Sequence, residues 1–186
     1  MAALAANLGP MRSEPPDEET YGRVTNPERF EPLVVAAKEL VDYLVMTFDV
    51  VRFAGTAATD FPNWPEESAE TVRLVPSRGV PLVVMFTDFP GLMVRVGEWG
   101  DLPGFPSCGC DACAESAEEC IEEFARLVTT AVNGDYTESL TKRELRYGYR
   151  GHWGSRNSRR PLRHREWKQY GEPGAHSWPP WSRRDA

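Results

Sequence analysis

The chain has 186 residues, of which 41% are hydrophobic and 26% charged. This composition is that of an ordinary globular protein, and the length suffices for one domain with its own core plus an appended segment. No apolar run approaches the roughly 18 residues that a membrane span needs, and residues 1–20 lack the basic flank and apolar block of a signal peptide. We therefore expect a cytoplasmic protein without membrane association, in a compartment that keeps thiols reduced.

Charge is divided unevenly along the chain. The net charge is -7 in total, but from residue 141 onward twelve Lys and Arg residues accompany only four acids. That region therefore carries +8, which leaves -15 for residues 1–140. The pattern predicts an acidic body followed by a basic C-terminal region.

The first elements in chain order are a leader and a helix. Residues 1–20 hold prolines and acids with little apolar surface to bury, so we expect a disordered leader. A long amphipathic helix is predicted over residues 26–48, where apolar residues recur at spacings of three and four. Asn26 suits its N-cap and Pro27 its first turn, whereas Pro32 should delay the regular part of the helix.

Short β-like runs come next. They cover residues 49–55, 71–77, 81–89 and 91–99, and a proline-rich loop separates the first two. The last two runs meet at Phe89-Pro90-Gly91-Leu92, a sequence that suits a type II turn and predicts a hairpin. In the final run Leu92, Val94 and Val96 alternate with Met93, Arg95 and Gly97, as in a strand with one side in water.

A second amphipathic helix is predicted over residues 113–133, with Cys113 and Cys120 on its apolar stripe and Gly134 as its stop. Beyond it we expect one more strand at residues 145–149 and no long periodic element. The predicted fold class is α+β: a small, mainly antiparallel sheet covered by two amphipathic helices, with an irregular, basic, aromatic C-terminal tail packed on the domain. The domain would span residues 21–150 and the tail residues 151–186.

The sequence "CGCDAC" is the strongest candidate for a chemical site. Cys108, Cys110 and Cys113 straddle the junction of loop and predicted helix, so that their sulfurs could surround one zinc ion. Tetrahedral zinc needs a fourth ligand, for which His152 or His176 in the tail are the candidates. A second paired knuckle, which structural zinc modules usually have, is missing from the sequence.

Three other interpretations of the cysteines stay open. Cys110 and Cys113 form a Cys-x-x-Cys pair at a predicted helix start, which is typical of redox sites, but the acids Asp111 and Glu115 should disfavour a thiolate. A disulfide is disfavoured by a reducing compartment. The cysteines could also be free structural thiols, as the core position of Cys120 suggests for that residue.

The tail combines arginines with aromatic residues, including four of the six tryptophans. This composition is found in proteins that stack on bases and contact phosphates. However, a free tail rarely exposes so much aromatic surface, so we expect it to pack on the acidic body, which argues against nucleic acid as a partner. A protein partner is the alternative, and the sequence leaves the oligomeric state open.

Several motifs together carry a resemblance to a known family. They are "YGRVTNPERF", "FTDFPG", "PSCGCDAC", "YGYRGHWGS" and "GEPGAHSWPPW". The chain resembles a family of uncharacterised actinobacterial proteins, a domain of unknown function, from Tyr21 to about Trp181. The resemblance implies that the tail belongs to the domain, and it implies no activity, cofactor or catalytic residue.

The sequence contains none of the motifs that single out an enzyme, such as a glycine-rich phosphate loop or a Gly-x-Ser-x-Gly elbow. Our first hypothesis is a non-enzymatic protein-interaction or regulatory module, immunity-like, whose acidic surface meets a basic partner. The second is a zinc-binding protein that uses the cysteine cluster. The third is an enzyme with a pocket between the sheet and the tail.

Overall fold

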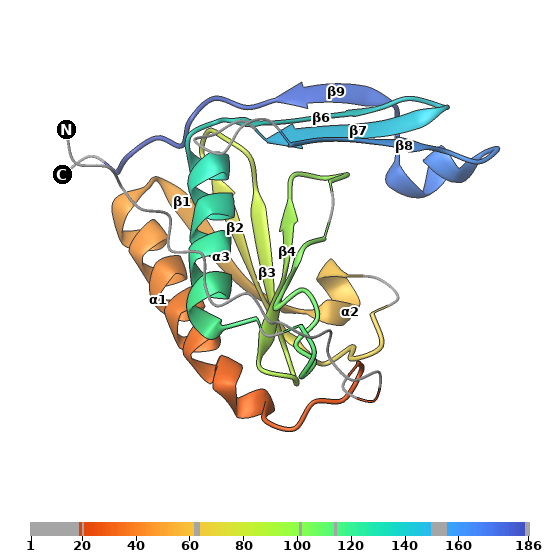
Figure 1. Cartoon of the computed structure of the whole chain (residues 1–186). Helices are drawn as coiled ribbons and strands as arrows, with labels where there is room; N and C mark the ends of the chain where they lie inside the picture. Colours follow the sequence, from red (N-terminus) through yellow and green to blue (C-terminus); the bar gives the residue numbers. More distant parts are fainter. Residues whose placement is uncertain are drawn as a thin grey trace, which may run out of the picture.

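Two long helices lie side by side against one face of a five-stranded antiparallel sheet, and a four-stranded sheet lies across the upper end of this assembly (Figure 1). The structure is a computed structural model that describes residues 19, 21–61, 64–100, 102–113, 115–149 and 156–184, with the backbone alone over 156–159. The predicted α+β class is confirmed, and the second sheet is an addition that the sequence did not predict.

The first helix starts after a tighter turn. Pro27–Phe30 form a 3-10 turn, and the α-helix α1 then runs over Glu31–Thr47 with Pro32 in its first turn. Proline is tolerated there because the first N–H groups of a helix have no partner within it. The predicted delay at Pro32 is thus confirmed. The buried residues of α1 follow helical spacing: Leu33, Ala37, Val41 and Leu44.

The first sheet keeps its strands in chain order. They are β1 (Val50–Thr56), β2 (Glu70–Pro76), β3 (Leu82–Thr87), β4 (Gly91–Val96) and β5 (Gly104–Phe105). β3 and β4 form the predicted hairpin, with Thr87 opposite Gly91. The buried side of the predicted alternation in β4 is also confirmed, because Leu92, Val94 and Val96 lie in the core beneath the helices. The prediction that the other side faces water is wrong, because Met93 and Arg95 are half-buried there.

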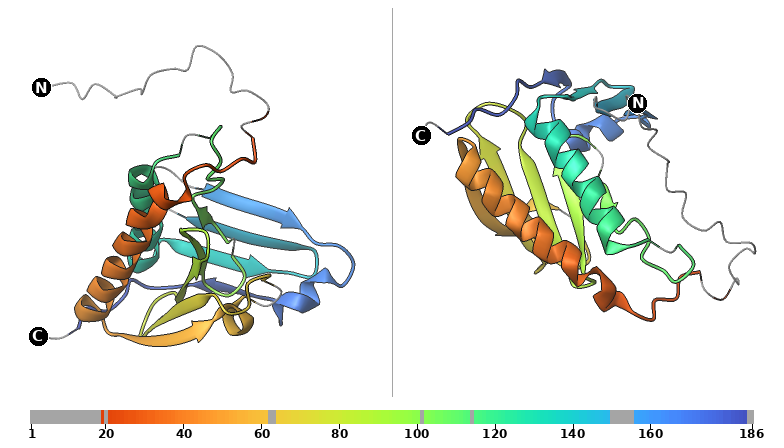
Figure 2. Two further views of the ribbon diagram at one scale, coloured as in Figure 1. Left: turned by 90° about the horizontal axis from the view of Figure 1, so that it is seen from below. Right: turned by 60° about the vertical axis from the view of Figure 1, so that its left-hand side comes forward.

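The second long helix, α3, covers Ala117–Val132 and lies beside α1 (Figure 2). Ser116 caps it: the Ser116 Oγ accepts a hydrogen bond from the backbone N–H of Glu119 at 3.1 Å, and the Glu119 carboxylate accepts one from the N–H of Ser116 at 3.1 Å. The helix therefore begins after Cys113, which our prediction wrongly placed inside it. Cys120 is buried on its core face, as predicted. No described helix has the length and hydropathy that crossing a bilayer requires.

The opposite face of the first sheet carries the short helix α2 (Ala57–Asp60). A small hydrophobic cluster fills the space between them, made of Ala57, Phe61, Ala69, Val83 and Met85. The buried carboxylate of Asp60 accepts a hydrogen bond from Thr71 Oγ1 and forms an ion pair with Arg73, both on β2. These polar groups therefore fix α2 on the sheet.

The second sheet is built partly from the tail. Its strands are β6 (Tyr136–Leu140), β7 (Glu144–Tyr149), β8 (Arg156–Pro161) and β9 (Gly174–Ser177), in the order β8-β7-β6-β9. β7 confirms the strand predicted at residues 145–149. β8 and β9 lie in the C-terminal tail, so the prediction that the tail is irregular is wrong for these residues. The two strands lack the apolar alternation that identifies a strand in a sequence.

A buried carboxylate joins the two sheets. Glu138 of β6 accepts a hydrogen bond from the N–H of Glu98 at 2.9 Å through Oε1. Its Oε2 accepts from the N–H of Trp99 at 3.0 Å and from the hydroxyl of Tyr136 at 2.9 Å. The turn that presents these N–H groups begins at Gly97, with a φ of 74°, where an added Cβ would lie 2.8 Å from Glu138 Oε2. Only glycine fits this position.

Trp181 anchors the end of the described chain in the core. Its side chain is buried, its Nε1 donates to the carbonyl of Val80 at 3.0 Å, and its ring meets that of Phe48 edge-on. Its backbone N–H donates to the carbonyl of Val132 at 2.9 Å. An added Cβ at Gly79 would lie 2.3 Å from the indole. The tail thus packs on the domain, as the sequence predicts.

Replacing Glu138 with Gln should lower the free energy of unfolding by about 2 kcal/mol, because one acceptor oxygen becomes an NH₂ group that faces backbone donors. Urea denaturation at pH 7 should show a lower midpoint with an unchanged slope. Glu118→Gln, on the exposed surface of α3, is the matched control and should unfold like the wild type. Equal midpoints for both variants would contradict a role for Glu138 in joining the sheets.

Candidate metal centre

The clustered cysteines lie in the loop between β5 and α3, at the lower end of α3 in Figure 1. Gly109 adopts a φ of 73°, which reverses the chain between Cys108 and Cys110. An added Cβ at this glycine would lie 2.8 Å from the ring of Phe89. The N–H of Cys113 then donates to the carbonyl of Cys110 at 3.2 Å and closes a turn. These two bends direct the three cysteine side chains toward one another.

The three sulfur atoms form one group. The Sγ atom of Cys110 lies 3.2 Å from that of Cys108 and 3.3 Å from that of Cys113, and all three lie within 4.8 Å of one another. Cys110 is buried, whereas Cys108 and Cys113 are exposed. The group is therefore closed toward the protein and open toward solvent.

A distant part of the chain, residues 21–29, packs against this loop, and we refer to it as the N-terminal segment. The guanidinium of Arg29 donates hydrogen bonds to the carbonyls of Gly109 at 3.0 Å and Cys110 at 3.3 Å. It therefore fixes the peptide groups on both sides of the buried cysteine.

Further hydrogen bonds connect the N-terminal segment to the cysteines directly. The N–H of Gly22 donates to the Sγ of Cys110. The N–H of Asp111 donates to the carbonyl of Arg23 at 2.9 Å. In return the Asp111 carboxylate accepts from the N–H of Thr25 at 3.1 Å and from Arg23 Nε at 3.3 Å. The Thr25 N–H is the main reason that the pKa of Asp111 lies below its usual value.

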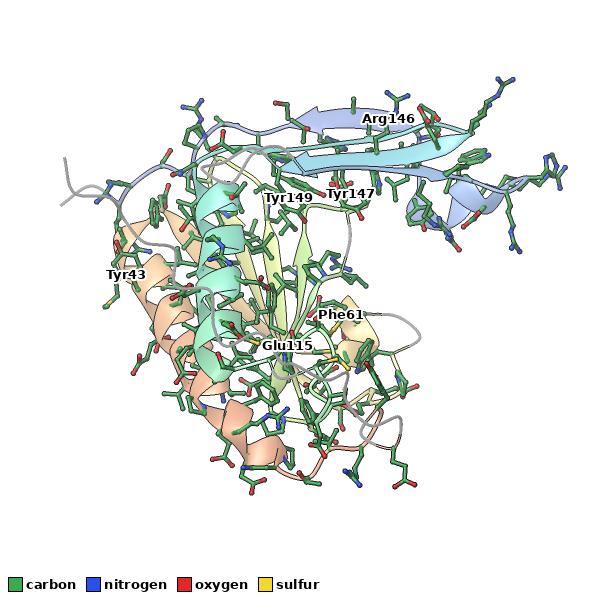
Figure 3. All side chains as sticks on the ribbon, in the orientation of Figure 1. Tyr43, Phe61, Glu115, Arg146, Tyr147 and Tyr149 are labelled. Atoms are coloured by element: carbon green, nitrogen blue, oxygen red, sulfur yellow. The ribbon has the colours of Figure 1, made fainter. Side chains whose placement is uncertain are left out.

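Glu115 holds the first half of the loop, and Figure 3 labels it beside the lower end of α3. Its carboxylate accepts from the N–H groups of Ser107 at 2.9 Å, Cys108 at 2.9 Å and Gly109 at 3.3 Å. Burial alone would raise the pKa of Glu115, but these N–H groups outweigh it and lower the pKa. The carboxylates of Glu115 and Asp111 are thus bound to backbone and side-chain donors, which weakens the opposition to a thiolate that the sequence suggests.

The environment of the sulfurs separates their pKa values. The Gly22 N–H, followed by the thiols of Cys108 and Cys113, lowers the pKa of Cys110 to about 6. Hydrogen bonds with the two other sulfurs raise the pKa of Cys113 to about 12. The cluster therefore favours one thiolate at neutral pH, located on the buried Cys110.

Soft thiolate ligands within one small sphere suit zinc or another thiophilic ion. Zn–S bonds near 2.3 Å require sulfurs about 3.5 to 4 Å apart, so the 3.2 Å and 3.3 Å pairs would have to widen slightly around an ion. The exposed side chains of Cys108 and Cys113 have room to do so.

The structure does not bring the proposed histidine ligand to the sulfurs. His176 lies in β9, beyond the other end of α3, with its ring 4.5 Å from that of Trp99 and 5.2 Å from that of Trp178 (Figure 1). His152 lies outside the described residues. Within the described chain, the group of candidate ligands consists of the three sulfurs.

Most of the chain matches a known family. The model of a family of unknown function (DUF6226) matches residues 9–185. The chain belongs to this family. The predicted membership of a family of unknown function is thereby confirmed, and the match includes the C-terminal region as well as the cysteine loop. No curated protein and no solved structure matches the chain.

Sequence reasoning missed the contribution of the N-terminal segment to this site. The motifs "YGRVTNPERF" and "PSCGCDAC" both stand out, but nothing in either indicates that they meet in space. Gly22, with a φ of 77°, presents its N–H to Cys110 only because the segment folds across the loop. For the start of α3, by contrast, the sequence did contain a signal, since Ser116 and Glu119 have the spacing of a capping box.

Replacing Glu115 with Gln should lower the free energy of unfolding by about 1 to 2 kcal/mol at pH 7, because the amide accepts fewer of the loop N–H groups. The pKa of Glu115 is lowered by folding, so its contribution is complete above the ordinary value of 4.5 and disappears as the pH falls through the folded value. Urea titrations from pH 7 to pH 3 should therefore show the two proteins converging in acid. A constant difference at every pH would contradict this assignment, and Glu118→Gln serves as the control.

Proposed function

We propose that this protein binds a thiophilic metal ion, zinc in the first place, through Cys108, Cys110 and Cys113. The observation that supports this most directly is the convergence of three sulfurs within 4.8 Å from a loop of six residues. Packing alone does not explain why the loop places three thiols together, because two of them are exposed. A metal ion would provide the attraction that holds them there.

The charge of the cluster agrees with this proposal. One thiolate is already favoured at Cys110, and two further thiolates in the same group would repel it. A divalent cation removes this repulsion and favours thiolate ligands, as metal coordination does generally. The remaining position of a tetrahedral zinc ion would be taken by water or by another ligand.

The metal ion would hold the N-terminal segment in place. Cys110 is hydrogen bonded to Gly22, and the adjacent Asp111 is bonded to Arg23 and Thr25. An ion that fixes Cys110 therefore also fixes the N-terminal segment, which leads directly into α1. We infer a structural and regulatory role for the ion, in which its binding orders this segment.

Untagged protein purified from cells should contain about one equivalent of zinc by elemental analysis, or take up one equivalent after chelation. Cys110→Ser should reduce the content to less than a tenth, because it removes the central ligand. Cys120→Ala, which changes the buried thiol on α3, is the control and should bind like the wild type. A zinc content that is equally low in wild type and Cys110→Ser would overturn the proposal.

Chelation should also expose the N-terminal segment to proteases. Trypsin cleaves after Arg23, whose carbonyl and side chain both contact Asp111. We expect cleavage at this bond to become roughly tenfold faster when zinc is removed, because local opening then costs less free energy. Cleavage after Arg78, in the turn between β2 and β3, is the internal control and should not change.

A second candidate function is protein binding through the outer surface of the helix layer. Exposed acids cover both helices: Glu31, Glu39 and Asp42 on α1, and Glu118, Glu119, Glu122 and Glu123 on α3. Among them Tyr43 and Met46 are 50% and 73% exposed, and Figure 3 shows Tyr43 on the outer side of α1. An acidic surface with exposed apolar residues fits a basic protein partner.

Charge reversal tests this second candidate. A variant with Glu122→Lys and Glu123→Lys should retain at least tenfold less of a partner captured from extracts of the source organism, since surface charge steers such binding. Salt near 0.5 M should weaken capture by the wild type, because it screens exposed charges. Glu66→Lys, on the loop after α2, is the matched control. A partner that binds all three proteins equally would contradict a role for the helix layer.

A further inference from the structure

The geometry of the cysteine loop also suits a covalent reaction between two of its sulfurs. Cys110 and Cys113 are the first and last residues of a turn closed by a hydrogen bond of 3.2 Å. Such a turn keeps its end Cα atoms within about 7 Å, which overlaps the range that a disulfide requires. The two sulfurs are already 3.3 Å apart. Small rotations of both side chains would bring them to bonding distance.

Burial assigns different roles to the two sulfurs. Cys113 is exposed, so a small oxidant reaches its sulfur from solvent. Cys110 is 2% exposed and lies behind it, where solvent and large reagents are excluded. An exposed thiol that reacts first and a buried thiol that lies next to it are the two components of a site that forms a disulfide on oxidation.

We propose that the cluster is an oxidation-sensitive site, in which peroxide joins Cys113 to Cys110 and thereby abolishes metal binding. This inference rests on the proposed function, because the released ion is the one described above. The disulfide removes two of the three ligands, and Cys108 alone cannot retain the ion. Metal-bound and oxidised forms therefore exclude each other.

The reaction balances with hydrogen peroxide as the only added reagent. As the sulfur of Cys113 attacks one peroxide oxygen, its proton passes to the Cys110 sulfur 3.3 Å away; the O–O bond breaks and leaves a sulfenic acid and a hydroxide, which solvent protonates to water. The sulfur of Cys110 then attacks the sulfenic sulfur, the S–O bond breaks, and the hydroxide leaves as a second water with the thiol proton. In sum two thiols lose two electrons and two protons to peroxide and become one disulfide and two waters.

Oxidation would reach the N-terminal segment through the same contacts that metal binding uses. The sulfur of Cys110 accepts the Gly22 N–H, and Asp111, which lies inside the ring that the disulfide closes, contacts Arg23 and Thr25. A bond at Cys110 changes the position of its sulfur relative to Gly22. The N-terminal segment would then report the redox state of the cluster.

The test uses the full chain, oxidised with hydrogen peroxide in its zinc-free and zinc-loaded forms. A protease that cleaves before aspartate separates Cys110 from Cys113, because Asp101, Asp111 and Asp135 bound the two peptides. A disulfide between Cys110 and Cys113 then links peptides 101–110 and 111–134, whereas one between Cys108 and Cys110 stays within the first. The Cys120→Ala background removes the other thiol of the second peptide, and Cys108→Ser excludes a link from Cys108.

In the zinc-free protein we expect the linked peptides to be the main product, to persist in Cys108→Ser, and to disappear in Cys113→Ser. In the zinc-loaded protein we expect peroxide to release the zinc to a colorimetric chelator in step with the loss of two thiols. Reduction with dithiothreitol should restore zinc binding.

Two results would overturn the inference. One is a zinc-free protein whose thiols react with peroxide without linking the two peptides, including the case of a link within the first peptide only. The other is linked peptides that form while zinc stays bound. A protein that forms the disulfide but never binds zinc would refute the proposed metal function and the release step, while it would leave the disulfide itself established.

Discussion

Burial of Trp181 is the constraint on which the arrangement of both sheets depends. Its indole contacts Val80 in the turn between β2 and β3 and Phe48 between α1 and β1, while its backbone N–H donates to the carbonyl of Val132 at the end of α3. The residue belongs to the same hydrophobic core as α1, α3 and the first sheet. Because β9 ends at Ser177, only a few residues separate this anchor from the second sheet. The tail is therefore part of the core, and the second sheet is positioned from two sides, by Trp181 and by the carboxylate of Glu138.

The cysteine loop is held in place differently from the tail, since its described residues provide no hydrophobic anchor as large as Trp181. Its conformation depends on hydrogen bonds from elsewhere: the carboxylate of Glu115 on one side, and the N-terminal segment on the other. Polar contacts at the surface contribute less to stability than a buried indole does, because water competes for the same groups. A region held in this way has a low free energy of local opening. A metal ion or a disulfide at the sulfurs therefore has a large effect there and little effect on the core.

The regular elements of the core could be predicted because their apolar residues repeat with the period of a helix or a strand. This holds for α1, for the hairpin of β3 and β4, and for most of α3. It fails for β6, β8 and β9, where pairing with neighbouring strands, and not an apolar pattern, determines the structure. At the site, the spacing of the cysteines indicated which sulfurs meet, but the donors from Gly22 and Arg29 lie about eighty residues away in sequence and leave no local signal. The same distance explains why Asp111 looked like a free negative charge in the sequence, whereas the N–H donors to Glu115 lie only 6 to 8 residues before it.

Because hydrogen bonds occupy the carboxylates of Asp111 and Glu115, the sulfurs themselves determine the electrostatics of the cluster. The Gly22 N–H and the neighbouring thiols stabilise one thiolate on Cys110, while hydrogen bonds with the sulfurs of Cys108 and Cys110 raise the pKa of Cys113. Further ionisation is opposed because unit charges within 4.8 Å repel strongly wherever water is partly excluded. Two changes remove that repulsion. A cation can neutralise the sulfurs, or a covalent bond can consume two of them. Both act on Cys110, whose sulfur accepts the Gly22 N–H, so a change at the cluster reaches the N-terminal segment that leads into α1.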